Sequence, residues 1–118
     1  MGLYYKSTRN SNLKVTASEA ILKGLAPDGG LFVPSELPKL DVSMSDLKGK
    51  TYQEIAYLVM KQFLTDFTEE ELKSCIDKAY DSKFDTEEIA PLVKVDDTYY
   101  MELFHGATTV SYTHLRAH

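Results

Sequence analysis

One stretch of the sequence decides how the chain folds back on itself: Ala20-Ile-Leu-Lys-Gly-Leu-Ala-Pro-Asp-Gly-Gly-Leu-Phe-Val-Pro34. Gly24 can end a helix with a positive φ, and residues 27–30 combine a fixed φ, a side-chain acceptor and two permissive glycines. The chain is therefore predicted to reverse at Pro27-Asp-Gly-Gly30. The apolar residues 31–33 that follow are predicted to be extended, and Pro34 limits them to a sheet edge or to irregular structure.

Three capping boxes predict where the helices begin, because each pairs a hydroxyl with a carboxylate three residues later. The pairs are Thr16 with Glu19, Thr51 with Glu54, and Thr68 with Glu71. The first predicts a helix over residues 17–23, and the other two open longer amphipathic helices. Cys75 falls on the apolar side of the last helix and is predicted to be buried in the core.

Short strands are predicted at both ends of the chain. Residues 3–8 form an N-terminal strand, while residues 92–95 and 98–104 form a hairpin around Asp96-Asp97. The predicted fold class is α+β: a small, mainly antiparallel sheet, made from the N-terminal strand and the C-terminal hairpin, packs against three main helices.

Composition narrows the class of protein. The 118 residues, 43% of them hydrophobic and 26% charged, are typical of one soluble globular domain. A net charge of −5 opposes binding to nucleic acid or to anionic membranes, and no apolar stretch reaches the length of a membrane span. The single cysteine cannot form an internal disulfide, so a reduced cytoplasmic location is expected.

Five segments, taken in order, resemble the N-terminal domain of threonine synthases over residues 3 to 108. They are Tyr5-Lys-Ser-Thr-Arg9, Glu19–Pro34, Tyr52-Gln-Glu-Ile-Ala56, Pro91-Leu-Val-Lys94 and Glu102-Leu-Phe-His-Gly106. The resemblance implies an N-terminal domain over residues 1–108. It also implies a parent enzyme that uses pyridoxal phosphate to convert O-phosphohomoserine and water to threonine and phosphate.

The resemblance ends before the residue that carries the cofactor. In the family, the segment that matches residues 102–106 continues as Pro-Thr and soon reaches Phe-Lys-Asp, whose lysine binds pyridoxal phosphate. Here Ala107 replaces the proline, Thr108 still matches, and no lysine follows Lys94. We therefore expect this chain to contain no catalytic or cofactor-binding residue and to be inactive alone. Its expected partners are the catalytic domains of the parent, and within that parent a small-molecule substrate.

The last ten residues, 109–118, have no counterpart in the family and resemble translated sequencing-adapter DNA. They are predicted to be an unrelated, disordered tail. His114 and His118 lie four residues apart within it, but they have no further ligand pair. No metal site is predicted.

Three residues are candidates for a substrate site in the parent enzyme: His105, Thr108 and Arg9. His105 and Thr108 lie where the family approaches its cofactor lysine, although a histidine at a strand end can also serve only as a structural hydrogen bonder. Arg9, beside two hydroxyls, offers groups suited to a phosphate, and the alternative is that these groups tie down the adjacent loop.

Two other functions remain open. The chain resembles part of a threonine-synthase-like phospholyase, which would act on a related phosphorylated substrate. It could also be a stand-alone, non-catalytic binding module.

Overall fold

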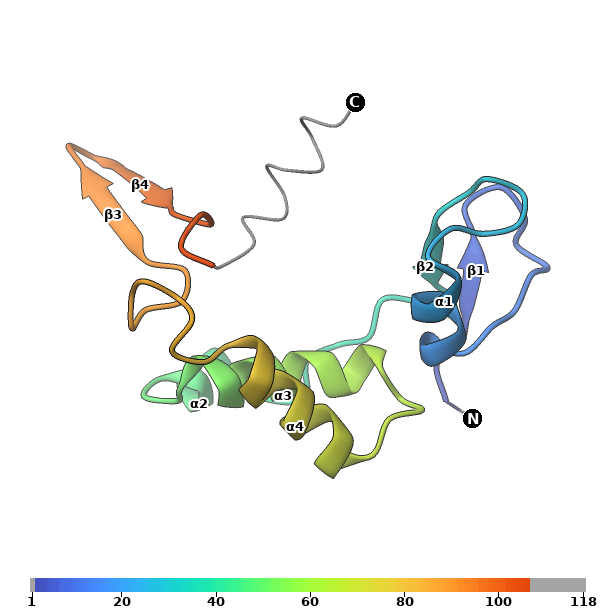
Figure 1. Cartoon of the computed structure of the whole chain (residues 1–118), viewed down its shortest axis with the longest axis horizontal. Coiled ribbons are helices and arrows are strands. Elements are labelled where there is room, and N and C mark those ends of the chain that lie inside the picture. Colours follow the sequence, from blue (N-terminus) through green and yellow to red (C-terminus); the bar gives the residue numbers. More distant parts are fainter. Residues whose placement is uncertain (1, 107–118) are drawn as a thin grey trace. The chain divides into compact units, whose positions relative to one another are not determined.

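The computed structural model describes residues 2–106 (Figure 1). These residues fall into two compact units. The first unit ends at Ile76 and the second begins at Asp77. Residues 107–118 lie outside the described residues, so the disordered tail and the domain limits at 108 and 109 stay predictions.

A pair of short antiparallel strands begins the first unit. β1 (Tyr5–Ser7) pairs with β2 (Phe32–Pro34), and Lys6 lies opposite Val33. The α+β class is confirmed, but the predicted joint sheet of N-terminal strand and C-terminal hairpin is wrong, because these strands belong to two separate two-stranded sheets. The turn at residues 27–30 brings β2 beside β1 through a much shorter loop than the hairpin would need.

The first helix, α1 (Ala17–Lys23), has the predicted bounds. Its capping box is formed as expected: the Thr16 N–H donates to Glu19 Oε2 over 2.8 Å, and the Glu19 N–H donates to Thr16 Oγ1 over 3.3 Å. Gly24 ends the helix with a φ of 69°. Small residues of the helix and its flanks are buried and make up the core here: Val15, Ala17, Ala20 and Ala26.

Three more helices follow: α2 (Met44–Leu47), α3 (Tyr52–Phe63) and α4 (Glu69–Ala79). The capping boxes predicted for α3 and α4 are both present. Helix α2 was not predicted, although Ser43 and Asp46 form the same kind of box with the shorter aspartate side chain.

The buried side of α4 is narrower than predicted. Leu72 and Ile76, four residues apart, are buried, whereas Cys75 is exposed. The prediction of a buried Cys75 is therefore wrong, because only the i, i+4 pair of the apolar stripe is covered and Cys75 lies at its margin.

The second unit contains the predicted hairpin. β3 (Leu92–Val95) pairs antiparallel with β4 (Thr98–Met101), and Val93 lies opposite Tyr100. The second strand ends three residues earlier than predicted. Every residue of both strands is exposed, so neither face of this hairpin is covered within the described chain.

Candidate functional site

The first candidate, Arg9, follows β1 and belongs to a compact network with the turn. Asp28 is the centre of this network: its Oδ1 accepts from Ser7 Oγ over 2.7 Å and from the Gly30 N–H over 2.9 Å. The Arg9 guanidinium donates to the Asp28 carbonyl over 3.1 Å, and the Arg9 N–H donates to Ser7 Oγ, also over 3.1 Å. The strand end and the turn are therefore joined by side-chain hydrogen bonds as well as by the sheet.

The strand and the turn approach each other closely at Gly30. A Cβ on this residue would overlap Ser7 Oγ and would lie 2.9 Å from Thr8 Oγ1. The Thr8 hydroxyl accepts from the Leu31 N–H over 3.0 Å, and Ser7 is only 3% exposed. Only glycine fits at position 30 without a shift of the neighbouring hydroxyls.

The polar side chains of residues 7–9 all take part in these contacts. The Ser7 hydrogen bond, together with the Gly30 N–H and the Arg9 charge, lowers the pKa of Asp28 below its ordinary value. Asp28 is thus held as a carboxylate that organises the turn. Both hydroxyls and the Arg9 guanidinium have partners inside this network, which supports the loop-anchoring role of Arg9 over phosphate binding.

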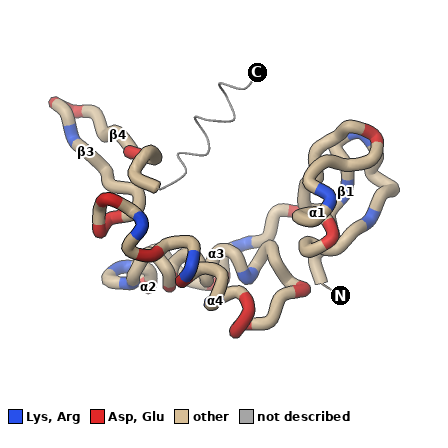
Figure 2. Tube along the Cα trace, in the orientation of Figure 1, with Lys and Arg blue, Asp and Glu red and all other residues tan. Residues whose placement is uncertain are grey.

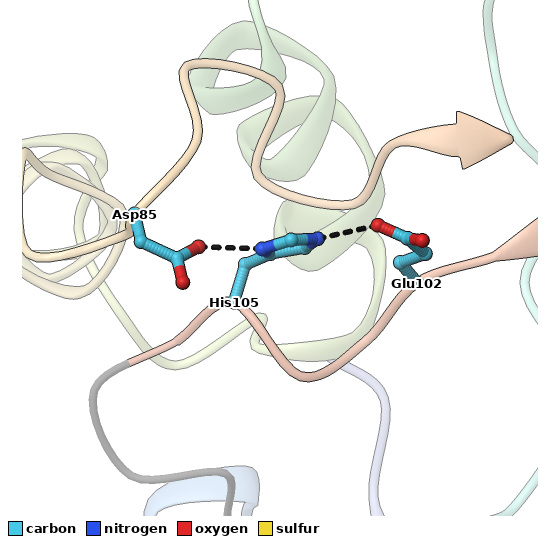
Figure 3. Close-up of polar contacts among 3 residues, drawn as sticks. All are labelled: Asp85, Glu102 and His105. Atoms are coloured by element: carbon cyan, nitrogen blue, oxygen red, sulfur yellow. Dashed lines mark hydrogen bonds and ion pairs between the residues drawn. The ribbon is translucent and has the colours of Figure 1, made fainter.

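The second candidate, His105, lies just after β4 in the other unit, where two carboxylates flank its ring (Figure 3). His105 Nδ1 lies 2.5 Å from Asp85 Oδ1, and His105 Nε2 lies 2.6 Å from Glu102 Oε2. The imidazole side chain is only 12% exposed. We refer to Asp85, Glu102 and His105 as the histidine clasp.

The electrostatics of the histidine clasp favour a charged ring. The hydrogen bond to Glu102 is the main cause that raises the pKa of His105, partial burial opposes it, and the contact with Asp85 raises it further. The sequence pattern contained Glu102 and His105 in one motif but gave no sign of Asp85, because Asp85 lies in an irregular segment twenty residues earlier.

A shallow groove of 510 Å³ runs along the hairpin. Its lining is mostly apolar, and Glu102 is its one charged residue; the full lining is Val93, Val95, Tyr100, Met101, Glu102, Leu103 and Phe104. An acidic group and the lack of a lysine do not fit a phosphorylated aldehyde such as pyridoxal phosphate. The groove instead has the character of a surface that packs against protein.

The remaining candidate residues lie outside the part of the chain that the structure describes. Thr108, His114 and His118 all lie outside the described residues, and residues 2–106 contain no cluster of side chains able to hold a metal. Acidic and basic residues are scattered along both units, with short acidic runs such as residues 69–71 (Figure 2). Within the same described range, no helix combines the length and the apolar character of a membrane span.

Comparison with known proteins gives a consistent result. Residues 4–80 match the family described as "Threonine synthase N terminus". Threonine synthase from Schizosaccharomyces pombe is 41% identical over 108 residues, which cover 88% of this chain and 21% of that protein. Human threonine synthase-like 1 is 40% identical over 96 residues, which cover 77% of this chain and 13% of that protein.

A solved structure shows the same fold. The crystal structure of pyridoxal-phosphate-bound threonine synthase from Brucella melitensis superposes with a TM-score of 0.79 at 33% identity. The superposition covers 92% of this chain and 24% of the Brucella chain. This chain thus spans about a fifth to a quarter of the threonine synthases that it matches.

Proposed function

Since this chain belongs to the threonine synthase family and corresponds to its N-terminal portion, we propose that it serves as the non-catalytic N-terminal part of a threonine synthase. The parent enzyme would convert O-phosphohomoserine and water to threonine and phosphate. Pyridoxal phosphate, bound by the rest of that enzyme, would supply the electron sink for the reaction.

The exposed hairpin is the observation that carries this proposal. The apolar side chains Val93, Val95 and Tyr100 lie on one face of β3 and β4, and they are 40%, 52% and 55% exposed. A contiguous apolar face on a two-stranded sheet is unstable in water without a covering partner. The remaining three quarters of a threonine synthase supply a partner of suitable size, and packing there would help to close the substrate cleft.

We also propose that the chain alone neither binds pyridoxal phosphate nor catalyses the reaction. The hairpin groove lacks a lysine and carries a carboxylate, and the polar groups around Arg9 bond to one another. Purified chain incubated with pyridoxal phosphate should emerge from gel filtration without a visible cofactor absorbance band. Retention of such a band would overturn this part of the proposal.

The N-terminal role can be tested by a replacement in the Schizosaccharomyces pombe enzyme. Deletion of its matching portion should abolish release of phosphate from O-phosphohomoserine, and insertion of residues 1–106 of this chain should restore it. Retained cofactor absorbance would show that the hybrid is folded. A deletion variant with full activity would refute the role, as would a folded hybrid without any turnover.

The similarity to human threonine synthase-like 1 supports a second candidate, a threonine-synthase-like phospholyase. The two candidates share this N-terminal part and differ in substrate. A complete parent enzyme that carries this chain should be assayed with O-phosphohomoserine and with phosphorylated amino-alcohol analogues. Preference for the analogues would favour the phospholyase.

Among the site candidates, we propose that His105 acts in the parent by fixing the chain beside the hairpin. We propose that Thr108 belongs to the substrate site of the parent, in the segment that leads to the cofactor lysine of the family. For Arg9 the contacts with the turn support anchoring. Arg9→Ala, made in the Schizosaccharomyces pombe hybrid that carries residues 1–106 of this chain, should lower stability and leave the affinity for O-phosphohomoserine unchanged. A large rise in KM with unchanged stability would instead assign Arg9 to the substrate site.

A further inference from the structure

The side chains of the hairpin make few packing contacts, so contacts at the end of the hairpin away from its turn hold it in place. Both strands are exposed throughout. At the open end, the Glu102 N–H donates to the Pro91 carbonyl over 3.0 Å, and the Asp85 N–H donates to the His105 carbonyl over 3.2 Å. The histidine clasp lies at the same place and joins the segment before β3 to the segment after β4.

We propose that the histidine clasp is a protonation-dependent device that positions the hairpin, with Asp85 and Glu102 both accepting a hydrogen bond from His105 as an imidazolium. The clasp thereby presents the apolar groove in one orientation. The identity of the groove's partner, the remainder of a threonine synthase, rests on the proposed function; the clasp itself does not.

The number of protons in the clasp follows from its geometry. A neutral imidazole has one N–H and one bare ring nitrogen, so it can donate to only one carboxylate and would face the lone pairs of the other. Both ring nitrogens lie within 2.6 Å of a carboxylate oxygen. With both carboxyls ionised, two short contacts of this kind need two N–H donors, which only the protonated ring supplies.

The surroundings of the ring strengthen this assignment. The Phe104 ring lies 4.5 Å from the His105 ring, centroid to centroid, and a Cβ at Gly106 would lie 3.1 Å from the Phe84 ring. The cation of the same loop, Lys83, is held elsewhere, since its Nζ pairs with Asp81 over 2.8 Å and donates to the Lys78 carbonyl. The charged groups that face His105 are thus Asp85, from the segment after α4, and Glu102, from the segment after β4.

The test is an NMR titration of the complete 118-residue chain, followed through the imidazole nitrogens and assigned with a His105→Gln variant. The pKa of His105 should be higher in the folded chain than in the same chain unfolded in urea. Asp85→Asn and Glu102→Gln should each lower the folded value. The matched controls Asp77→Asn and Glu88→Gln each remove one charge in the same unit and should leave the pKa of His105 nearly unchanged.

Amide hydrogen exchange provides the readout for positioning. When the pH rises above the folded pKa of His105, protection of the Asp85 and Glu102 amides should fall by about tenfold for each pKa unit between the folded and unfolded values. His105→Gln should show the low protection at every pH, while circular dichroism reports that the helices remain formed.

Three results would overturn the proposal. The first is an equal pKa of His105 in the folded and unfolded chain, and the second is a fall of that pKa in the control variants as large as in Asp85→Asn and Glu102→Gln. The third is amide protection at the hairpin that does not change as His105 titrates. None of these measurements requires enzymatic activity or a partner. A failed hybrid enzyme with an intact His105 titration would therefore reject the proposed function alone.

Discussion

At the scale of single residues, Gly30 has less room for a side chain than any other glycine of the described chain. Its backbone lies against the hydroxyls of Ser7 and Thr8, and a methyl group there would overlap Ser7 Oγ. Its φ is not positive, so the constraint comes from space and not from backbone strain. Steric requirements and hydrogen bonds to Asp28 thus act on the same residue.

We expect Gly30→Ala to lower the free energy of unfolding by about 1–3 kcal/mol, because the neighbouring strand must move to make room. Urea denaturation followed by circular dichroism measures the change. In a double-mutant cycle with Ser7→Ala, the combined loss should be smaller than the sum of the single losses, since Ser7→Ala removes the overlapping hydroxyl. Strict additivity would contradict the steric explanation.

Asp66 is a second residue with a specific structural role, since it holds the start of α1 from the loop between α3 and α4. Its Oδ2 accepts from the Ser18 N–H over 3.0 Å and from the Ser18 hydroxyl over 2.5 Å. Burial alone would raise the pKa of Asp66, but these hydrogen bonds outweigh it and leave the pKa below its ordinary value. The carboxylate also suits the positive end of the helix dipole.

Because the folded-state pKa of Asp66 is depressed, its stabilisation is present above the unfolded pKa and is lost as the pH falls through the folded pKa. Asp66→Asn should cost about 1 kcal/mol at pH 7, since solvent screens an exposed carboxylate. This difference should shrink below about pH 4. Urea denaturation at several pH values tests it, with Glu36→Gln as an exposed control that should show no such pH dependence.

At the scale of elements, the hairpin turn contains the one non-glycine residue with a positive φ among residues 2–106. Asp96 has a φ of 52°, whereas the next residue, Asp97, does not share this conformation. Glycine adopts positive φ at no steric cost, while an L side chain does so at a penalty that is smaller for aspartate than for most residues. The two aspartates are thus chemically alike and conformationally different.

Asp96→Gly should therefore stabilise the hairpin, by up to about 1 kcal/mol. Asp97→Gly, which removes the same charge without relieving any positive φ, should leave the hairpin no more stable than it is now. Amide hydrogen exchange across β3 and β4 measures both effects. Equal stabilisation by the two variants would mean that charge, and not backbone conformation, limits the hairpin.

Local signals in the sequence predicted elements well where the chemistry lies within a few residues. The capping boxes at Thr16, Thr51 and Thr68 each mark a helix start, and α1 has the predicted bounds. The box at Ser43 was missed because aspartate replaces the longer glutamate.

Pairing and burial were harder to predict because they depend on distant residues. The periodic pattern could not show which strand β1 pairs with, since any short extended segment offers the same backbone groups. The exposure of Cys75 depends on how much of α4 is covered. At the candidate site, His105 was found from its motif, whereas Asp85 reaches it only through the fold.

At the scale of the whole molecule, the described chain leaves many large apolar side chains in water. On the hairpin and the segment after it, these include Leu92, Tyr99, Tyr100, Met101, Leu103 and Phe104, each at least half exposed. If the rest of a threonine synthase covers this surface in the parent, the isolated chain lacks that cover. A second copy of the chain is the simplest partner that would bury the same surface.

We expect the isolated chain to self-associate as its concentration rises, because association buries the hairpin groove. Val93→Lys places a charge inside the groove and should shift the association to higher concentration. Leu37→Lys makes the same kind of change at an exposed residue of the first unit and should have little effect. Sedimentation velocity over a concentration series measures the association of both variants. An equal shift for Val93→Lys and Leu37→Lys would mean that the surface responsible for association lies outside the groove.

The local pairing of β1 with β2 also affects how the protein is made. All the backbone partners of this small sheet lie within residues 5–34, so they can meet as soon as that length has left the ribosome. The turn, with Asp28 and Gly30 at its centre, can then fold during synthesis. The N-terminal strand edge is thus covered before downstream segments emerge and compete for it.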